Sequence, residues 1–163
     1  MSKLRGFEVV RPDVLADPKP ASVETDLSGL EILLPKRGTS HAAGCDFFIQ
    51  QDVILPPGKI ILIPTGVKAY MQGDEVLNIY DRSSNPIKKG IVLMNSVGII
   101  DSDYYGNEFN DGMICGQFKN ISDVPVTLKR GEAFMQGVFQ KYLLADNDET
   151  TSERTGGFGS TGN

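Results

Sequence analysis

Residues 53–74 read VILPPGKIILIPTGVKAYMQGD, and this stretch decides the fold class. It holds three short apolar runs, at 53–55, 60–64 and 67–71, in which β-branched residues are frequent. Pro-Pro-Gly, Pro-Thr-Gly and Gln-Gly-Asp punctuate these runs. Proline and glycine at such points are typical of tight turns, and short β-branched runs between turns are typical of strands. The stretch therefore predicts three consecutive β-strands.

Runs of the same kind recur along most of the chain, whereas helical periodicity is nearly absent. The further predicted strands cover 30–34, 45–49, 76–80, 91–94, 113–118, 126–128 and 134–142. Strands at this regular spacing are typical of an all-β sandwich, jelly roll or barrel. One short helix is expected within 83–90, where Pro86 and Gly90 limit its length.

The two ends of the chain differ from its middle. Residues 11–20 hold three prolines, which predicts an irregular N-terminal arm, over 1–29, within a single domain that covers 1–145. Residues 146–153 are acidic and polar, as in a linker, and the chain closes with GGFGSTGN. We therefore expect 146–163 to form a flexible C-terminal arm. A tail that is only disordered does not need an aromatic residue, so Phe158 indicates a further role for this segment.

Composition narrows the classes of function. The chain has 163 residues, which fits one domain with a real core. Its net charge is −5 and its isoelectric point is about 4.9, which argues against binding to a nucleic-acid polymer but leaves a small anionic ligand open. No apolar run reaches the ~18 residues of a membrane span. We expect a soluble, cytoplasmic protein with no membrane partner.

The histidine and cysteine content limits the chemistry further. His41 is the only histidine, so a metal site with two histidines is excluded, and a loop-like sequence around it predicts a surface position. Cys45 and Cys115 lie far apart in no metal-ligand spacing and are expected to be free buried thiols. Hydrolysis by this chain would depend on carboxylates, arginines and a bound metal ion.

Five separate segments carry residues suited to chemistry, as expected of a site built from loops on a β scaffold. In the first, AGCDF, Asp46 is one carboxylate among apolar residues; the alternative is a bend that enters a strand. In the second, DRSSN, Arg82 offers a planar set of donors, and Ser83 and Ser84 offer hydroxyls. This combination suits phosphate oxygens, although a polar turn would have the same composition.

The third segment is NSVGIIDSDYYG at 95–106. Its Ile99-Ile100 pair is expected to run into the core, and Asp101 follows at once. Asp103, two residues on, shares a face with it in extended chain. Asp101 is a candidate base for activating water, and Tyr104 can offer a ring to a sugar or a base. The alternative is a simple β-turn.

The fourth and fifth segments lie near the C-terminus. In GEAFMQG, Gln136 is a polar residue inside an apolar strand and needs a partner, either structural or a ligand. In RTGGFGSTG, glycines allow the backbone to approach an anion, Arg154 adds charge, and Phe158 can stack on a planar ring. This composition indicates a lid for a nucleotide polyphosphate.

Taken in order, the five segments resemble the five motifs of the trimeric dUTPase family, from about residue 40 to the C-terminus, and are most similar to its bacterial and phage branch. The resemblance implies a distorted jelly roll (β-clip) that forms a homotrimer with shared sites and a mobile C-terminal arm. It implies hydrolysis of dUTP to dUMP and pyrophosphate, which keeps uracil out of DNA and supplies dUMP for thymidylate synthesis. Mg²⁺ is the implied cofactor.

The resemblance also implies a role for each matched residue. Asp101 is implied to activate the water that attacks the α-phosphorus, and Asp46 to lie near the water shell of the metal without binding it directly. The implied substrate-binding residues are Arg82, Ser83, Ser84, Asn95, Gly98, Ile100, Tyr104, Gln136, Arg154, Phe158, Gly159 and Ser160.

The sequence departs from the family pattern at three points. Ala133 stands where the family often has an arginine, and Asp81 precedes Arg82 where an apolar residue or proline is common. The fifth motif has one residue fewer between Arg154 and GGFG. Three alternatives stay open: a dCTP deaminase-like enzyme of the same fold, an inactive β-trimer, and a phage-type regulatory dUTPase that binds a protein partner through the N-terminal arm or residues 107–112.

Overall fold

The structure is a computed structural model that describes residues 2–159. Its elements follow the chain in the order β1 (Gly6–Val9), α1 (Pro12–Ala16), β2 (Lys36–Arg37), β3 (Cys45–Phe48), β4 (Val53–Leu55), β5 (Ile60–Pro64), β6 (Val67–Tyr70), β7 (Glu75–Asp81), the π-helical turn η1 (Asn85–Lys89), β8 (Ile91–Leu93), β9 (Val97–Asp101), the 3₁₀ turn η2 (Ser102–Tyr104), β10 (Cys115–Asn120), β11 (Val126–Leu128) and β12 (Ala133–Lys141). The predicted all-β class is confirmed.

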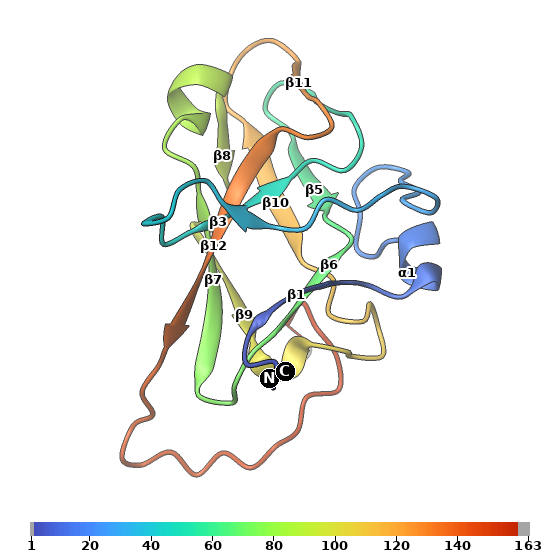
Figure 1. The fold of residues 1–163 in the computed structure, drawn as a ribbon. Helices are drawn as coiled ribbons and strands as arrows, with labels where there is room; N and C mark the ends of the chain where they lie inside the picture. Colours follow the sequence, from blue (N-terminus) through green and yellow to red (C-terminus); the bar gives the residue numbers. More distant parts are fainter. Residues whose placement is uncertain (1, 160–163) are drawn as a thin grey trace.

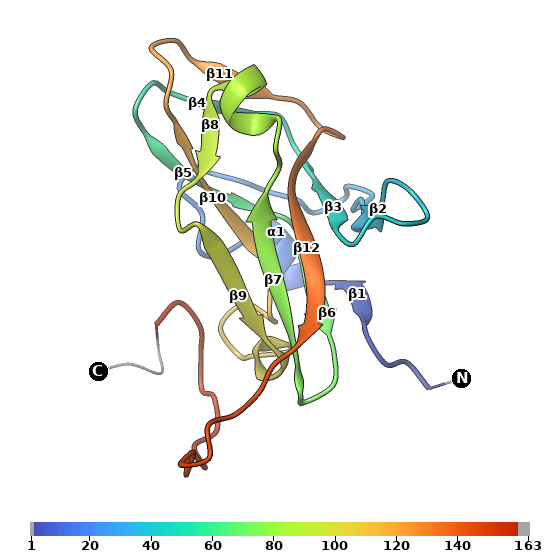
Figure 2. The ribbon, with the colours of Figure 1, turned by 90° about the vertical axis from the view of Figure 1, so that its left-hand side faces the viewer.

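The strands form one larger sheet and three smaller groups, all antiparallel. The larger sheet has the order β2-β3-β12-β7-β9, and a second sheet has the order β5-β10-β8. Two ribbons complete the fold: β1-β6, which is labelled in Figure 1, and β4-β11, which is labelled in Figure 2. Strand β9 is an edge strand, because it pairs with β7 alone. Figure 2 shows the long β7-β12 pair running through the middle of the molecule beside β9.

The core lies between these sheets and follows from the alternation of side chains along each strand. In β10, every second residue is buried, as the two-residue period of a strand predicts. The rings of Phe118 and Phe134 meet with centroids 5.4 Å apart. A Cβ at Gly116 would lie 2.6 Å from the Phe134 ring, so only glycine fits at this point of β10. The sheets can pack closely here because this residue has no side chain.

Most predicted strands are confirmed, and those at 53–55, 60–64 and 126–128 have the predicted bounds. The short helix predicted within 83–90 is present as η1. The strand predicted at 30–34 is wrong, because the side-chain amide of Gln50 binds both the backbone N–H and C=O of Leu33, each at 2.9 Å. A side chain thus takes the place of a partner strand.

The expected course of residues 97–101 needs a correction too. These residues form strand β9, in which inward and outward positions alternate. Ile100 packs against the core, but the neighbouring Ile99 is 67% exposed and does not run into it. Adjacent residues of a strand point to opposite faces, so the pair cannot both be buried on a one-sided sheet.

The N-terminal arm is more regular than predicted. Strand β1 pairs with β6, with Phe7 opposite Ala69, and the short helix α1 begins with Pro12. Proline suits the first helical position because its φ is already helical and its missing N–H needs no partner there. Pro12 therefore starts one helical turn where the sequence indicated only irregular chain.

After β12 the chain has no further helix or strand up to residue 159. Leu143 is 96% exposed where this segment leaves the sheet. The chain then turns back, so that Gly157 approaches Tyr104 of η2. In Figure 2 the segment loops out below the sheet before it returns. Among residues 2–159, no helix is both long and apolar enough to cross a membrane.

Candidate active site

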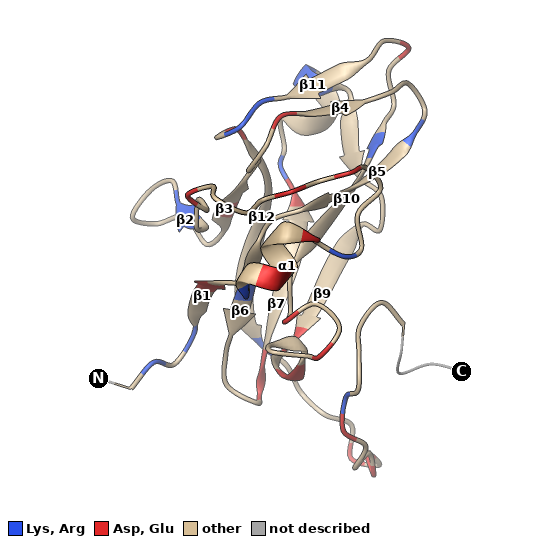
Figure 3. Cartoon of the chain, turned by 90° about the vertical axis from the view of Figure 1, so that its right-hand side faces the viewer, with Lys and Arg blue, Asp and Glu red and all other residues tan. Residues whose placement is uncertain are grey.

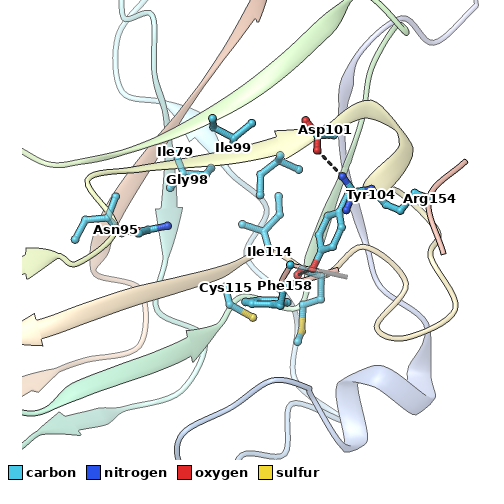
Figure 4. Close-up of a pocket in the computed structure, with 14 residues that line it drawn as sticks. Ile79, Asn95, Gly98, Ile99, Asp101, Tyr104, Ile114, Cys115, Arg154 and Phe158 are labelled. Atoms are coloured by element: carbon cyan, nitrogen blue, oxygen red, sulfur yellow. Dashed lines mark hydrogen bonds and ion pairs between the residues drawn. The ribbon is translucent and has the colours of Figure 1, made fainter. Parts of the chain in front are cut away.

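A cavity of about 310 Å³ lies beside strand β9. Its walls come from β7, β8, β9, η2, residues 113–115 and the C-terminal arm (Figure 4). The predicted site residues that line it are Asn95, Gly98, Ile100, Asp101, Tyr104, Arg154, Phe158 and Gly159. The cavity thus joins the third and fifth sequence segments, whose residues Asp101 and Arg154 are 53 positions apart in the chain.

The inner wall of the cavity is apolar. Ile79, Leu93, Met113, Ile114 and Cys115 line it, and sequence reasoning assigned none of them to the site. Each lies in or beside an apolar run and is indistinguishable from a core residue until its neighbours are known. Gly98 keeps the wall open, because a Cβ there would lie 3.1 Å from Cβ of Ile79.

Tyr104 forms a rigid part of the cavity wall. The residue is only 7% exposed, and its hydroxyl donates to the carbonyl of Met113 at 2.9 Å. The same hydroxyl accepts a hydrogen bond from the amide of Asn110 at 2.8 Å. Burial raises the pKa of Tyr104 to about 12, so the phenol stays protonated at neutral pH. The ring is therefore a fixed, uncharged surface.

Arg154 connects the C-terminal arm to the acidic end of β9. Its Nη2 donates to Asp101 Oδ2 (Figure 4). Its Nε donates to Asp103 Oδ1 at 2.7 Å. Its guanidinium also lies over the ring of Tyr104, 5.9 Å from the centroid. One cation thus bridges both carboxylates that the sequence placed on one face. An anionic ligand that attracts Arg154 would release Asp101.

The glycines of the arm allow it to lie on Tyr104. A Cβ at Gly157 would come within 2.7 Å of Tyr104 Cε2. Phe158 adopts a positive φ of 53° and turns its ring into the cavity near Cys115 (Figure 4). Gly159 is the last described residue, and the predicted site residue Ser160 lies outside the described part of the chain.

A second cluster of predicted residues lies on the larger sheet. In β12, Gln136 pairs with Asp46 of β3 on one side and with Tyr80 of β7 on the other. Arg82 follows β7, and its Nε donates to Asp46 Oδ1 at 3.1 Å. Gln136 Nε2 donates to the carbonyl of Asp81 at 3.0 Å. Segments far apart in sequence are thus joined by strand register.

Ser83 and Ser84 belong to the same cluster. They follow Arg82 directly at the turn that leads into η1, and the side chain of Ser83 is exposed. Together with Arg82 they present a guanidinium and two hydroxyls at the end of β7. That is the donor set that sequence reasoning matched to phosphate oxygens.

Asp81 does not oppose an anion at this cluster, because its carboxylate is bound within its own chain. It accepts hydrogen bonds from the backbone N–H of Arg82 and Leu93, both at 2.8 Å, and from Asn85 Nδ2 at 2.6 Å. The carboxylate thereby joins β7, η1 and β8.

A lysine lies close to Ala133, where the family often has an arginine. Lys89 Nζ forms an ion pair with Glu132 at 3.0 Å and lies 3.5 Å from the Ala133 carbonyl. Arg82 Nη1 reaches the same carbonyl at 3.3 Å. Positive charge is therefore present beside Ala133 although the residue itself is apolar.

Asp101 and Arg82 lie at opposite ends of the β7-β9 pair, and the cavity extends along β9 between these ends. Asp101 pairs with Val76 at one end, and Tyr80 pairs with Val97 at the other. Arg82 is six residues beyond Val76, which corresponds to about 20 Å along a strand. A single chain therefore does not bring Arg82 into contact with Asp101.

Comparison with known proteins identifies the family. The dUTPase family profile matches residues 31–162. The deoxyuridine 5′-triphosphate nucleotidohydrolase of Lactococcus lactis is 51% identical over 162 residues, which cover 98% of this chain and 99% of that protein. The chain belongs to the dUTPase family.

Solved dUTPase structures agree with this fold. The crystal structure of the dUTPase from Streptococcus mutans matches with a TM-score of 0.73 at 51% identity and covers 87% of this chain and 99% of that one. The dUTPase of Staphylococcus bacteriophage 80alpha matches with a TM-score of 0.64 over 99% of each chain, at 18% identity. At that identity the likeness concerns the dUTPase fold alone.

Proposed function

We propose that the chain hydrolyses dUTP to dUMP and pyrophosphate at sites shared between three copies of the chain. The observation that carries the proposal is the cavity that joins Asp101, Tyr104 and the C-terminal arm in one place. Membership of the dUTPase family supports the same substrate. The physiological result would be the removal of dUTP before uracil enters DNA, with dUMP supplied for thymidylate synthesis.

Uracil would bind in the apolar cavity along β9. Because β9 is an edge strand, backbone N–H and C=O groups on its free side are available to pair with the base. Mismatched donors on cytosine would leave buried groups unpaired, which can discriminate by up to ~10⁴–10⁵. The narrow space at Gly98, with Ile79 behind it, would exclude a methyl group at C5 of the base.

The sugar would lie on the ring of Tyr104, and the arm would cover the base. Tyr104 is buried and hydrogen-bonded at its far end, so its ring cannot move aside for a 2′-hydroxyl. Phe158 would stack on uracil, and the backbone at Gly159 would approach the phosphates. Closure of the arm would exclude water other than the nucleophile.

Asp101 would act as the general base. Its carboxylate would take a proton from the water that attacks the α-phosphorus, with pyrophosphate as the leaving group, and would contribute ~10²–10⁴-fold to the rate. In the structure Asp101 is paired with Arg154. The triphosphate would draw Arg154 away from the carboxylate, so that substrate binding would itself free the base and place the cation on the phosphates.

The residues present fit Mg²⁺ held mainly by the substrate. Within residues 2–159, no group of three or more metal-binding side chains converges. Mg²⁺ keeps several waters and prefers phosphate oxygens, so it does not require such a group. Asp46, half-buried beside Arg82, would contact the water shell of the ion. When bound, the ion would offset the charge that develops on the leaving pyrophosphate.

A homotrimer would bring the two halves of the site together. Arg82 of one chain, with Ser83, Ser84 and Gln136 beside it, would meet Asp101 of a neighbouring chain, because Arg82 and Asp101 are ~20 Å apart within one chain. The outward residues Val97 and Ile99 of β9 are exposed and would be covered by that contact. In this arrangement residues 1–145 form the domain and 146–163 form the closing arm.

The alternatives have less support. Deamination of the base requires a glutamate at the base, and no glutamate is among the described residues that line the cavity. A regulatory protein partner stays a prediction. Figure 3 shows acidic and basic residues mixed over the fold, which fits a small substrate better than a nucleic-acid polymer. The free thiols of Cys45 and Cys115 fit a reducing, cytoplasmic setting.

The direct test is pyrophosphate release from dUTP, dCTP, dTTP and UTP in the presence of Mg²⁺, for the unsubstituted chain and for Asp101→Asn. We expect turnover of dUTP alone, its loss when Mg²⁺ is chelated, and its loss in the variant, which should still bind dUTP. Turnover of dCTP with release of ammonia, or near-normal turnover by Asp101→Asn, would contradict the proposal.

A further inference from the structure

A loop of buried polar residues supports Tyr104 from behind. Residues 105–112 connect η2 to the segment before β10, and Asn110 within them is only 1% exposed. Asn107 and Asp111 are buried as well. A buried amide or carboxylate is costly unless its donors and acceptors are paired, so such a concentration of polar groups requires a specific arrangement.

Asn110 uses both ends of its side chain. Its Nδ2 donates to the hydroxyl of Tyr104 at 2.8 Å and to the carbonyl of Lys19 at 3.0 Å. Its Oδ1 accepts from the backbone N–H of Gly112 at 3.1 Å and from Asn107 Nδ2 at 3.0 Å. The amide therefore joins the phenol, its own loop and the N-terminal arm.

These bonds also fix the direction of the Tyr104 hydroxyl. Because Asn110 Nδ2 is a donor, the phenol oxygen must accept from it. The phenol hydrogen is then free to point to the carbonyl of Met113, 2.9 Å away. Two opposed bonds at the far end of the side chain hold the ring against tilting.

The loop is itself fastened to the sheet, so Asn110 cannot follow a moving ring. Asp111, which has a positive φ of 59°, accepts hydrogen bonds from Lys68 Nζ at 2.8 Å and from the backbone N–H of Arg11 at 2.9 Å. Lys68 lies in β6. The carbonyl of Asp111 also accepts from the N–H of Gly106 at 3.1 Å. The support for Tyr104 is therefore continuous from the sheet to the phenol.

We propose that Asn110 is a positioning residue that acts through the hydroxyl of Tyr104 and sets how strictly the site rejects ribose. The inference rests on the proposed function, in which the Tyr104 ring lies under the sugar. A ring freed at its hydroxyl end can tilt and leave room for a 2′-hydroxyl. Loss of Asn110 should therefore raise acceptance of UTP more than it lowers turnover of dUTP.

The test compares Asn110→Ala with Asn120→Ala. Asn120 is 0% exposed, and its Nδ2 donates to the carbonyls of Leu55 and Val124, both at 2.8 Å, but it does not line the cavity. The measured quantity is kcat/KM for dUTP divided by kcat/KM for UTP. The ratio should fall about fivefold in Asn110→Ala, as expected for the loss of one hydrogen bond. The ratio should be unchanged in Asn120→Ala when the two variants are compared at an equal loss of thermal stability.

A double-substitution cycle shows whether Asn110 acts through the phenol. Tyr104→Phe removes the hydroxyl and keeps the ring, so it should lower the ratio by a similar factor, and adding Asn110→Ala should lower it little further. An unchanged ratio in either single variant, or factors that multiply in the double variant, would overturn the inference. If Asn110→Ala does not fold, Asn110→Asp takes its place by the same criterion, because it keeps an acceptor for the N–H of Gly112 and removes the donor to the phenol. Absence of dUTP turnover by the unsubstituted chain would overturn the proposed function together with the inference, whereas turnover with an unchanged ratio would overturn the inference alone.

Discussion

The carboxylate of Asp81 should be one of the most important single polar groups for stability, and Asp81→Ala tests this. The substitution removes the acceptor of three hydrogen bonds, from the N–H of Arg82, the N–H of Leu93 and Nδ2 of Asn85. Leu93 and Asn85 are buried, so water cannot fully replace the lost acceptor. At about 1–1.5 kcal/mol for each bond, the free energy of unfolding should fall by about 3–4.5 kcal/mol.

Two further variants separate this effect from a general effect of removing charge. Asp123→Ala removes an exposed carboxylate from the loop between β10 and β11 and should change the free energy of unfolding by less than about 0.5 kcal/mol. Asp81→Asn keeps one acceptor oxygen and the shape of the side chain, so its loss should lie between the two.

The assay is urea unfolding at one protein concentration, because any assembly of copies adds a concentration-dependent term. The denaturant slope should stay constant while the midpoint falls. A change of less than about 0.5 kcal/mol in Asp81→Ala would refute the reasoning, since it would mean that the three donors find other partners or that the carboxylate is not bound. A loss as large in Asp123→Ala would refute it as well.

Three further predictions concern the C-terminal arm. Gly157→Ala should lower kcat/KM for dUTP without lowering the melting temperature, because the new Cβ would clash with the ring of Tyr104. The control is Gly73→Ala, where a Cβ meets nothing within 4 Å. Equal kcat/KM values for the two variants would contradict this prediction. Phe158→Ala should weaken dUTP binding by about 1–3 kcal/mol, as for loss of base stacking elsewhere, and calorimetry that finds no change would exclude Phe158 as the stacking ring. Truncation after Asn147 should leave a folded protein with little dUTP turnover, and loss of the folded state in circular dichroism would instead give the arm a structural role.

The parts of the fold that local chemistry decides could be predicted from the sequence. Strands β4 and β5 are bounded by the turn at Pro56-Pro57-Gly58, and their bounds were predicted correctly. The strand predicted at 30–34 does not form, because this segment pairs with the side chain of Gln50, which no local sequence pattern reveals. The prediction that Ile99 runs into the core was wrong because the apolar character of an edge strand does not indicate which of its faces is covered.

Some residues of the candidate site could likewise be predicted from the sequence, and others could not. Motif residues such as Asp101 and Arg154 stand out by chemical type, and the structure brings them into contact. Ile79 and Ile114 of the cavity wall resemble core residues in sequence, and only the fold places them beside a cavity. Asn110 was missed for a related reason: its importance follows from its contact with Tyr104, six residues away around a loop whose path the sequence does not reveal.

The central claim is that Asp101 of one chain acts with Arg82 of another, and complementation tests it most directly. Asp101→Asn and Arg82→Ala should each be inactive on dUTP alone. When equal amounts are unfolded together and refolded as mixed trimers, about a quarter of the sites should combine an intact Asp101 from one chain with an intact Arg82 from its neighbour. We predict recovery of about a quarter of the pyrophosphate release of the unsubstituted protein. No recovery above the two inactive parents, in trimers shown to be mixed, would contradict the account.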